Sequence, residues 1–480
     1  MPYIAKLEKA GIPTVVVDLA DQEQMVKQES LVNGVPKIRY LHASRILSGP
    51  EDVDRFIEPM LQELLRPLNE EEKESGLYTI PQKRIIFEGT LEEAQDFYQQ
   101  TEWIPLPVEA PIAKYTDGFP IIVPTEEKVA WMLTGTSRKP DEILTRQADL
   151  TTVGVAWETL EPKGELIRFQ PLQRTATVEQ VAVNAIMAGC RPEHLPIVLA
   201  IAQSGCPIST TNFPSQAVCV SGPIVKEIGM NTGCGMLGPG SVVNSPIGRT
   251  YQLMALNLGG AVTGLNRMGC LGSPLNNGGV AYAENADGLP VGWKGLNEEF
   301  GFRKDESIVM VQMITGGILG SQFSPGGYRA LQKSGHGGIA RKFNVKGTPG
   351  PHNWLDYIVP ELYAGREGAW TIVMVPEMAQ HLVDLGFTSK NDVYKYLWEK
   401  GFEPLKKYRG RSWPDYSRNG WTGIEKTSGK PWKELPDDYM VPAAGDDPNE
   451  FCITIGGGQE EACIQLAGGR GNAFSIDVWR

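Results

Sequence analysis

The sequence predicts an α/β protein with several short, mostly parallel sheets and flanking helices. A small N-terminal α/β domain is expected to precede a larger α/β domain with candidate internal repeats. Three observations favour this class. Short runs of β-branched residues alternate with helical patterns along the chain. Glycine accounts for 54 of the 480 residues, above the usual share of about 7%. A chain of this length also exceeds what one undivided core normally supports.

Composition argues against several classes of partner. Hydrophobic residues at 41% and charged residues at 21% are typical of globular domains. No apolar run approaches the roughly 18 residues that a membrane-spanning helix needs, so no membrane partner is expected. The net charge of −12 argues against nucleic acid as a partner. Residues 1–11 lack the apolar core of a secretory signal, which favours a cytoplasmic location.

The small domain is predicted over residues 1–75. A helix over 2–10 leads through Gly11-Ile12-Pro13 into a strand at Val15-Val16-Val17-Asp18-Leu19. The next strand is expected at Lys37-Ile38-Arg39-Tyr40-Leu41, and a helix over 51–65 follows the Ser48-Gly49-Pro50 turn. A charge-rich stretch after this helix predicts a linker.

The larger domain is predicted over residues 80–480, beginning with the run Arg84-Ile85-Ile86-Phe87 and a helix over 91–99. Three times a helix is expected to stop at a glycine, with a short polar turn after it. These turns follow Gly135, Gly189 and Gly386. The similarity indicates either internal duplication of an α/β unit or only the shared chemistry of helix caps.

Residues 403–450 differ in composition from the rest of the larger domain. Trp413, Trp421 and Trp432 stand among prolines, glycines and charged residues. Long irregular segments inside compact domains are commonly lids or binding loops. The segment is therefore a candidate lid or subunit contact, and the alternative is a surface excursion anchored by its tryptophans.

The segment 229–240 is the strongest candidate for ligand binding. Five glycines within these twelve residues expose backbone N–H groups that can bind an anion. A helix expected over 250–258 would add its positive N-terminus, and Arg249 would bind a carboxylate or phosphate. The predicted substrate-binding residues are Asp117, Asn231, Gly233, Gly238, Gly240, Asn244 and Arg249. The alternative is a purely structural turn, since the segment matches no Walker or dinucleotide motif.

Candidate catalytic residues lie in or near this segment. Glu227 and Glu284 are candidates for proton transfer, because a carboxylate in a poorly solvated cleft can have a raised pKa. Cys234 is the first candidate nucleophile and Cys206 the second, although a buried, unreactive thiol is the alternative for each. Neither the seven cysteines nor the five histidines show metal-ligand spacing, so the sequence supports no metal. It does not identify a cofactor.

Two more glycine-rich segments follow predicted strands. Gly456-Gly457-Gly458 comes directly after the β-like run 451–455, and Gly468-Gly469-Arg470-Gly471-Asn472 follows shortly afterwards. Strands that end in glycine are typical of a pocket at the carboxyl edge of an α/β sheet.

Several of these motifs resemble the UGSC family of thiol or selenol proteins. The matching segments are Asp117-Gly118-Phe119-Pro120-Ile121-Ile122-Val123-Pro124-Thr125, Ala182-Val183-Asn184-Ala185-Ile186-Met187-Ala188-Gly189-Cys190, and Glu227-Ile228-Gly229-Met230-Asn231-Thr232-Gly233 through Gly238-Pro239-Gly240. Gly11-Ile12-Pro13-Thr14-Val15-Val16-Val17 resembles the part of that family's small domain just after its Sec/Cys-Gly-Ser-Cys motif. The resemblance implies that residues 1–75 present a redox residue and that residues 80–480 form the pocket.

The chain departs from that family in one respect: it contains no Cys-Gly-Ser-Cys, and Met1 falls where that motif would have just ended. We expect the redox pair to lie upstream. It would belong either to a separate small Cys- or Sec-containing subunit or to a segment lost when an in-frame selenocysteine codon is read as a stop. The DNA immediately before codon 1 tests this expectation.

The leading hypothesis is a subunit of a thiol- or selenol-dependent oxidoreductase that acts on a small, carboxylated substrate and forms an oligomer. Arg249 and the 233–240 backbone would bind the anionic end of the substrate, while Glu227 or Glu284 would handle protons. One alternative is a redox-neutral lyase or hydratase that uses carboxylate acid/base chemistry in the same pocket. The other is a non-catalytic ligand-binding or scaffold subunit.

Overall fold

The computed structural model describes residues 2–32, 34–35, 37–43, 53–73, 83–104, 110–149, 162–208, 215–265, 267, 274–314, 352–356, 369–407, 424–425, 427–442, 447–458 and 463–480. It has the predicted α/β character, with helices flanking several small sheets.

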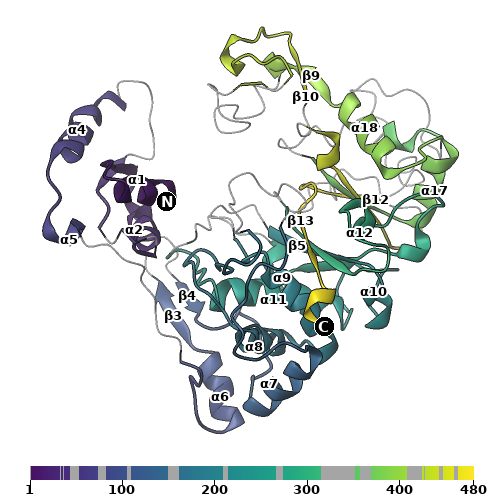
Figure 1. Ribbon diagram of the computed structural model, residues 1–480, viewed down its shortest axis with the longest axis horizontal. Coiled ribbons are helices and arrows are strands. Elements are labelled where there is room, and N and C mark those ends of the chain that lie inside the picture. The colour runs from purple at the N-terminus through teal and green to yellow at the C-terminus, as the bar shows by residue number, and fades with distance from the viewer. Residues whose placement is uncertain are drawn as a thin grey trace.

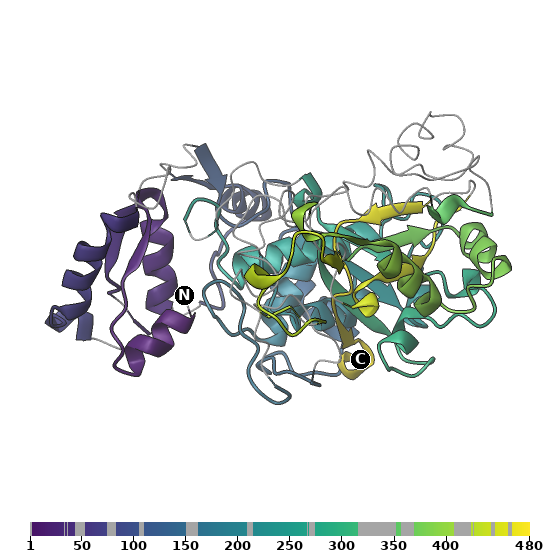
Figure 2. The same ribbon diagram turned by 90° about the horizontal axis from the view of Figure 1, so that it is seen from above.

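The N-terminal elements lie together at one side of the molecule in both views (Figures 1 and 2). They are α1 (Pro2–Lys9), β1 (Val16–Leu19), α2 (Glu23–Val32), β2 (Tyr40–Ala43), α4 (Ile57–Leu65) and α5 (Glu70–Lys73). β1 and β2 pair in parallel, as a β-α-β unit requires. One predicted bound is wrong, because the second strand begins at Tyr40. The helix expected over 51–65 is interrupted, since residues 53–54 are helical, a turn follows, and α4 begins at Ile57. The domain boundary near residue 75 stays a prediction.

The remaining elements form the larger body of the molecule (Figure 1). Its helices are α6 (Leu91–Tyr98), α7 (Glu126–Met132), α8 (Val178–Ala188), α9 (Leu195–Ala202), α10 (Ile224–Glu227), α11 (Asn244–Asn257), α12 (Leu296–Glu299), α17 (Pro376–Asp384) and α18 (Lys390–Lys400). Its strands are β3 (Thr101–Ile104), β4 (Ala110–Ala113), β5 (Ser215–Ser221), β6 (Val280–Ala283), β7 (Ile308–Ile314), β8 (Thr371–Met374), β9 (Phe402–Pro404), β10 (Met440–Pro442), β11 (Cys452–Ile455), β12 (Cys463–Leu466) and β13 (Asn472–Ser475).

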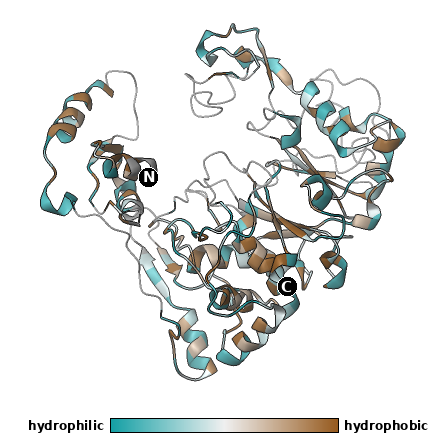
Figure 3. Cartoon of the chain, viewed as in Figure 1, coloured by the Kyte–Doolittle hydropathy of each residue, from teal (hydrophilic) through white to brown (hydrophobic). Residues whose placement is uncertain are grey.

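Two sheets stack face to face between two layers of helices. One sheet has the order β13-β7-β5-β6 and the other the order β11-β8-β12. Alternate residues of a strand point to opposite faces, so Val218 and Val220 of β5 pack with α8, α9 and α11, whereas Ala217 and Cys219 pack with the second sheet. The outer face of that second sheet packs on α17 and α18. Hydrophobic colour follows these strands and the helices over them (Figure 3).

The strand pairing is mixed rather than mostly parallel, which corrects the prediction. Among the described strands, three pairings are parallel and five are antiparallel. β7 runs against β5 and β13 against β7. Buried strands are apolar in either orientation, so their composition does not reveal the direction of pairing.

All three predicted helix stops at glycine are present, but a helix follows the next turn in only two cases. α8 ends at Gly189, whose φ is 96°, and the helical segment 192–202 follows. After Gly386, Ser389 caps α18 with its side chain. After Gly135 the chain instead becomes extended, and Ile143 forms a bridge with Thr177. Shared capping chemistry and internal duplication both stay predictions.

The segment 403–450 is anchored where it is described. β9 and β10 form an antiparallel pair, and Trp432 packs in a small cluster with Leu405, Leu435 and Val441. Trp413 and Trp421 lie outside the described residues, and the role of this segment as a lid or subunit contact stays a prediction.

Across the described part of the chain, no single helix is long and apolar enough to cross a membrane. α8 and the following helical segment, residues 192–202, reach the required length only as a pair bent by 119°. Most side chains of α8 and all of those in α9 are buried in the core.

Candidate functional site

Two of the predicted glycine-rich segments meet at the ends of strands. β5 and β6 are parallel, as are β8 and β11, and the loops after these strands come together. The Gly457 amide donates to the Thr232 carbonyl at 2.8 Å, and the Asn285 amide donates to the Ile455 carbonyl at 2.7 Å. A side chain at Gly456 would collide with the Met236 sulfur. The carboxyl ends of strands are where α/β proteins commonly bind ligands.

Part of the 229–240 loop is held by its own hydrogen bonds. The Gly233 amide donates to Asn231 Oδ1 at 2.9 Å, and the Gly238 amide donates to the Gly235 carbonyl at 2.8 Å. The Asn244 side chain accepts from the Asn231 amide at 3.0 Å and donates to the Asn231 carbonyl at 2.9 Å. Four residues that were predicted to bind substrate therefore use these groups to shape the loop instead: Asn231, Gly233, Gly238 and Asn244.

Other amides of this region remain available. Among the described residues, no hydrogen-bond partner is found for the backbone N–H of Cys234, Gly235, Gly240 or Gly458. Gly235 and Gly240 have φ angles of 70° and 103°, values that glycine adopts without strain. Successive free N–H groups form a concavity that attracts anions.

Cys234 is the exposed thiol of this region. It carries an exposed side chain, whereas the other five described cysteines are buried. Burial raises the pKa of Cys206 to about 12 and that of Cys452 to about 11. A Cβ placed on Gly458 would lie 3.6 Å from the Cys234 sulfur. The thiol therefore lies beside the second glycine loop, next to the available amides.

Arg249 is engaged by Asp117 rather than presented to a ligand. Its Nε and one terminal nitrogen donate to the two Asp117 oxygens at 2.9 and 2.7 Å, and both side chains are largely buried. The helix predicted to begin at Thr250 begins at Asn244, so Arg249 lies inside α11. The structure thus brings two predicted substrate-binding residues together as an ion pair. In the described part of the chain, neither residue hydrogen-bonds to the 229–240 loop.

Glu284 is the centre of a buried network of charges. Its carboxylate accepts from Lys390 Nζ at 2.7 Å, from Ser221 Oγ at 2.8 Å and from the Leu296 amide at 2.6 Å. Lys390 also lies 3.2 Å from Glu299, which in turn contacts Arg470 at 3.4 Å. Burial lowers the pKa of Lys390, but the charges of Glu284 and Glu299 outweigh this effect and raise it overall. Two anions and two cations thus balance inside the protein.

Glu227 lies at the surface. Its carboxylate pairs with Arg480 at 2.9 Å, and about half of its side chain is exposed. Glu227 and Glu284 therefore lie in different environments, one solvated and one fully hydrogen-bonded.

Gly458 belongs to a glycine-rich segment that the sequence predicted at a pocket, whereas Lys390 and Glu299 were not predicted as parts of these arrangements. Lys390 follows the capping residue Ser389, a position at which lysine is normally solvated. A buried lysine in the first helical turn is recognisable only once its partners, more than 90 positions away in sequence, are known. In the described residues, no group of three or more His, Cys, Asp or Glu side chains is placed to hold a metal.

No protein-family model, no curated protein and no solved structure matches the chain.

Proposed function

We propose that this chain is a subunit of a thiol-dependent oxidoreductase that acts on a small carboxylated substrate, with Cys234 as its reactive thiol. The observation that carries the proposal is the exposure of Cys234 between two glycine loops at the strand ends. A reactive cysteine must be accessible and needs neighbours that favour the thiolate. The adjacent amides of Cys234, Gly235 and Gly458 supply partial positive charge.

The simplest electron-balanced reaction is the reduction of a small carboxylated disulfide. The Cys234 thiolate attacks one sulfur, the disulfide bond breaks, and a mixed disulfide forms while the departing thiolate takes up a proton. A thiol or selenol of the Sec/Cys-Gly-Ser-Cys pair, on the small partner subunit that the UGSC resemblance implies, then attacks the Cys234 sulfur, releases the second substrate thiol and becomes bonded to Cys234. The other thiol of that pair attacks this new bond and restores the Cys234 thiol. The partner's pair is oxidised, and two electrons pass from the partner to the substrate.

The lyase alternative has less support. It needs Glu284 as an acid/base group, but three donors already bind this buried carboxylate. Glu227 is exposed and paired with Arg480.

Single-turnover mass spectrometry tests the proposal. The reduced protein is mixed with dithiodiglycolate or with the neutral 2-hydroxyethyl disulfide, and the rate of adduct formation at Cys234 is followed by peptide mapping. We expect the carboxylated disulfide to react at least about tenfold faster, although like charges slow its attack by thiolates in free solution. Cys234→Ser should abolish this adduct, and Cys206→Ser, which changes a buried cysteine, should retain it. Equal rates for both disulfides would contradict an anion-binding site beside Cys234 and would favour the scaffold role.

A further inference from the structure

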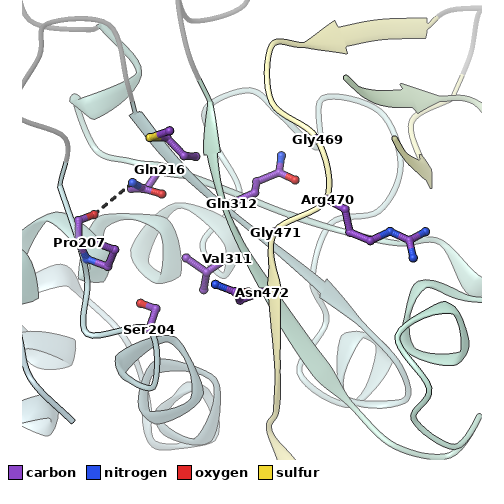
Figure 4. Close-up of a pocket in the computed structure, with 10 residues that line it drawn as sticks. Ser204, Pro207, Gln216, Val311, Gln312, Gly469, Arg470, Gly471 and Asn472 are labelled. Atoms are coloured by element: carbon purple, nitrogen blue, oxygen red, sulfur yellow. Dashed lines mark hydrogen bonds between the residues drawn. The ribbon is translucent and has the colours of Figure 1, made fainter. Parts of the chain in front are cut away.

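A cavity of about 80 Å³ lies at the end of the first sheet that is opposite the Cys234 loops. It is lined by Ser204 and Pro207 after α9, by Gln216 of β5, by Val311 and Met313 of β7, and by Asn472 of β13. Figure 4 shows Ser204, Pro207 and Asn472 around this space, with the Arg470 side chain directed away from it.

The register of the strands explains why the cavity is polar. Gln216 pairs with Met313 and Asn472 pairs with Val311, and cross-strand partners point to the same face of a sheet. That face is the one covered by α9, and further along it carries Val218, Val220 and Phe474. α9 ends at Ala202, so the helix does not cover the level of Gln216 and Asn472.

The Asn472 carboxamide is the unsatisfied group of this cavity. Asn472 is 7% exposed, its Oδ1 is buried without a hydrogen-bond partner, and its Nδ2 has no partner among the described residues. Arg470 Nε is also buried without a partner, but the Arg470 side chain is directed away from the cavity (Figure 4). Two other polar lining side chains have partners. Gln216 Nε2 donates to the Pro207 carbonyl at 3.1 Å, and Ser204 Oγ donates to the Ile201 carbonyl at 2.8 Å. Buried polar groups are almost always hydrogen-bonded, so Asn472 needs a partner that enters the cavity.

The geometry points to a binding site for a small neutral carboxamide, which we propose as a second ligand site of this protein. A carboxamide offers one donor and one acceptor side by side, so it pairs with the Asn472 amide through two hydrogen bonds. A charged ligand is disfavoured, because Arg470 is engaged with Glu299 and no other charged side chain lines the described cavity. Since a cavity of about 150 Å³ holds the six non-hydrogen atoms of benzene, this one suits a ligand of about three to four.

Acetamide is the probe that tests this site, with the full chain and ligand-observed NMR. We expect saturable binding with a dissociation constant on the order of 1 mM, the range open to so small a ligand. Acetate, which has the same shape but a charge, should bind at least about tenfold more weakly. The proposal would be overturned if acetamide and acetate bound equally, or if acetamide did not bind at concentrations up to about 100-fold above the expected dissociation constant. Ordered water would then be the partner of Asn472.

Variants separate this site from an effect on folding. Asn472→Leu keeps the branched shape but removes the amide, and it should abolish acetamide binding. Gln465→Leu is the matched control, because Gln465 also carries a buried, unpartnered amide oxygen but lies outside the cavity. Val311→Ile adds one methylene to the wall and should weaken acetamide binding while leaving Asn472 in place. Retained binding in both Asn472→Leu and Val311→Ile would contradict the proposal, and far-ultraviolet circular dichroism checks that each variant is folded.

Discussion

The two glycine-rich regions of the larger body have similar composition but different structural roles. In the 468–471 run, a Cβ at Gly468 or Gly471 would collide with the β7 backbone, at the carbonyls of Met313 and Val311 respectively. In the 229–240 loop, a Cβ at Gly235 or Gly240 would meet nothing within 4 Å. The first region uses glycine so that two backbones can pack closely. The second uses glycine for turns that leave amides available, which is what a ligand site needs.

A similar contrast separates two groups of charged residues. The Glu284–Lys390–Glu299–Arg470 network is closed and buried, and it includes one residue of the 468–471 run. Near the loops, Lys226 pairs with Asp287, and both side chains are more than half exposed. We therefore expect substitutions in the packed region to change stability and substitutions in the loops to change reactivity.

Lys390→Met should have the largest effect, a loss of about 3–5 kcal/mol in unfolding free energy, because it leaves the buried Glu284 carboxylate without a cation and Glu299 with Arg470 alone. Lys226→Met is the control and should change stability little, since exposed pairs contribute at most about 1 kcal/mol. Urea unfolding at pH 7 measures both. Equal effects of the two variants would contradict the difference between the regions.

This loss should also depend on pH in a specific direction. The pKa of Lys390 is raised in the folded protein above its ordinary value of 10.5. Its stabilising contribution is therefore fully present below pH 10.5 and declines as the pH rises through the higher folded-state pKa. The difference between wild type and Lys390→Met should be constant from pH 7 to 9 and should begin to shrink only above this range.

Gly471→Ala should destabilise the protein by about 3 kcal/mol, because β7 cannot move away from the new methyl group without breaking the sheet. Gly233→Ala is the matched control: its Cβ would find its nearest neighbour, Asn231 Oδ1, at 3.8 Å. We expect a change below about 1 kcal/mol there. Thermal unfolding compares the two variants, and a strongly destabilised Gly233→Ala would show that the loop is packed as tightly as the strand.

Arg249→Ala should cost about 2 kcal/mol of stability, the usual contribution of charge-assisted hydrogen bonds, because it leaves the Asp117 carboxylate largely buried and unpaired. The double variant Asp117→Asn/Arg249→Ala should lose less than the sum of the two single losses. If the two losses are additive in a double-mutant cycle, the interaction between Asp117 and Arg249 contributes nothing to stability.

Cys234→Ser should have the smallest effect on stability, within about 0.5 kcal/mol, because the side chain is exposed. Its effect on reactivity should be large. Under native conditions, peptide mapping after iodoacetamide treatment should find Cys234 modified far faster than Cys190, Cys206, Cys219 or Cys452. Comparable modification of these buried cysteines would contradict the assignment of Cys234 as the accessible thiol.

The sequence by itself determined the local features of this protein. The α/β class, the first strand, the helices that stop at Gly135, Gly189 and Gly386, and the presence of turns at the glycine-rich segments all depend on residues within a few positions of one another. Local propensity and capping chemistry act over such short distances, so a pattern of residue types is enough to predict them.

Only the tertiary structure decided which groups are already occupied. The partner of Arg249 lies 132 positions away in the sequence, and the partner of Lys390 lies 106 positions away. The direction of strand pairing and the glycines that permit close packing also depend on such distant neighbours. Whether a charge, an amide or a thiol can act on a ligand depends on what has already bound or buried it, and this depends on how the distant segments pack together.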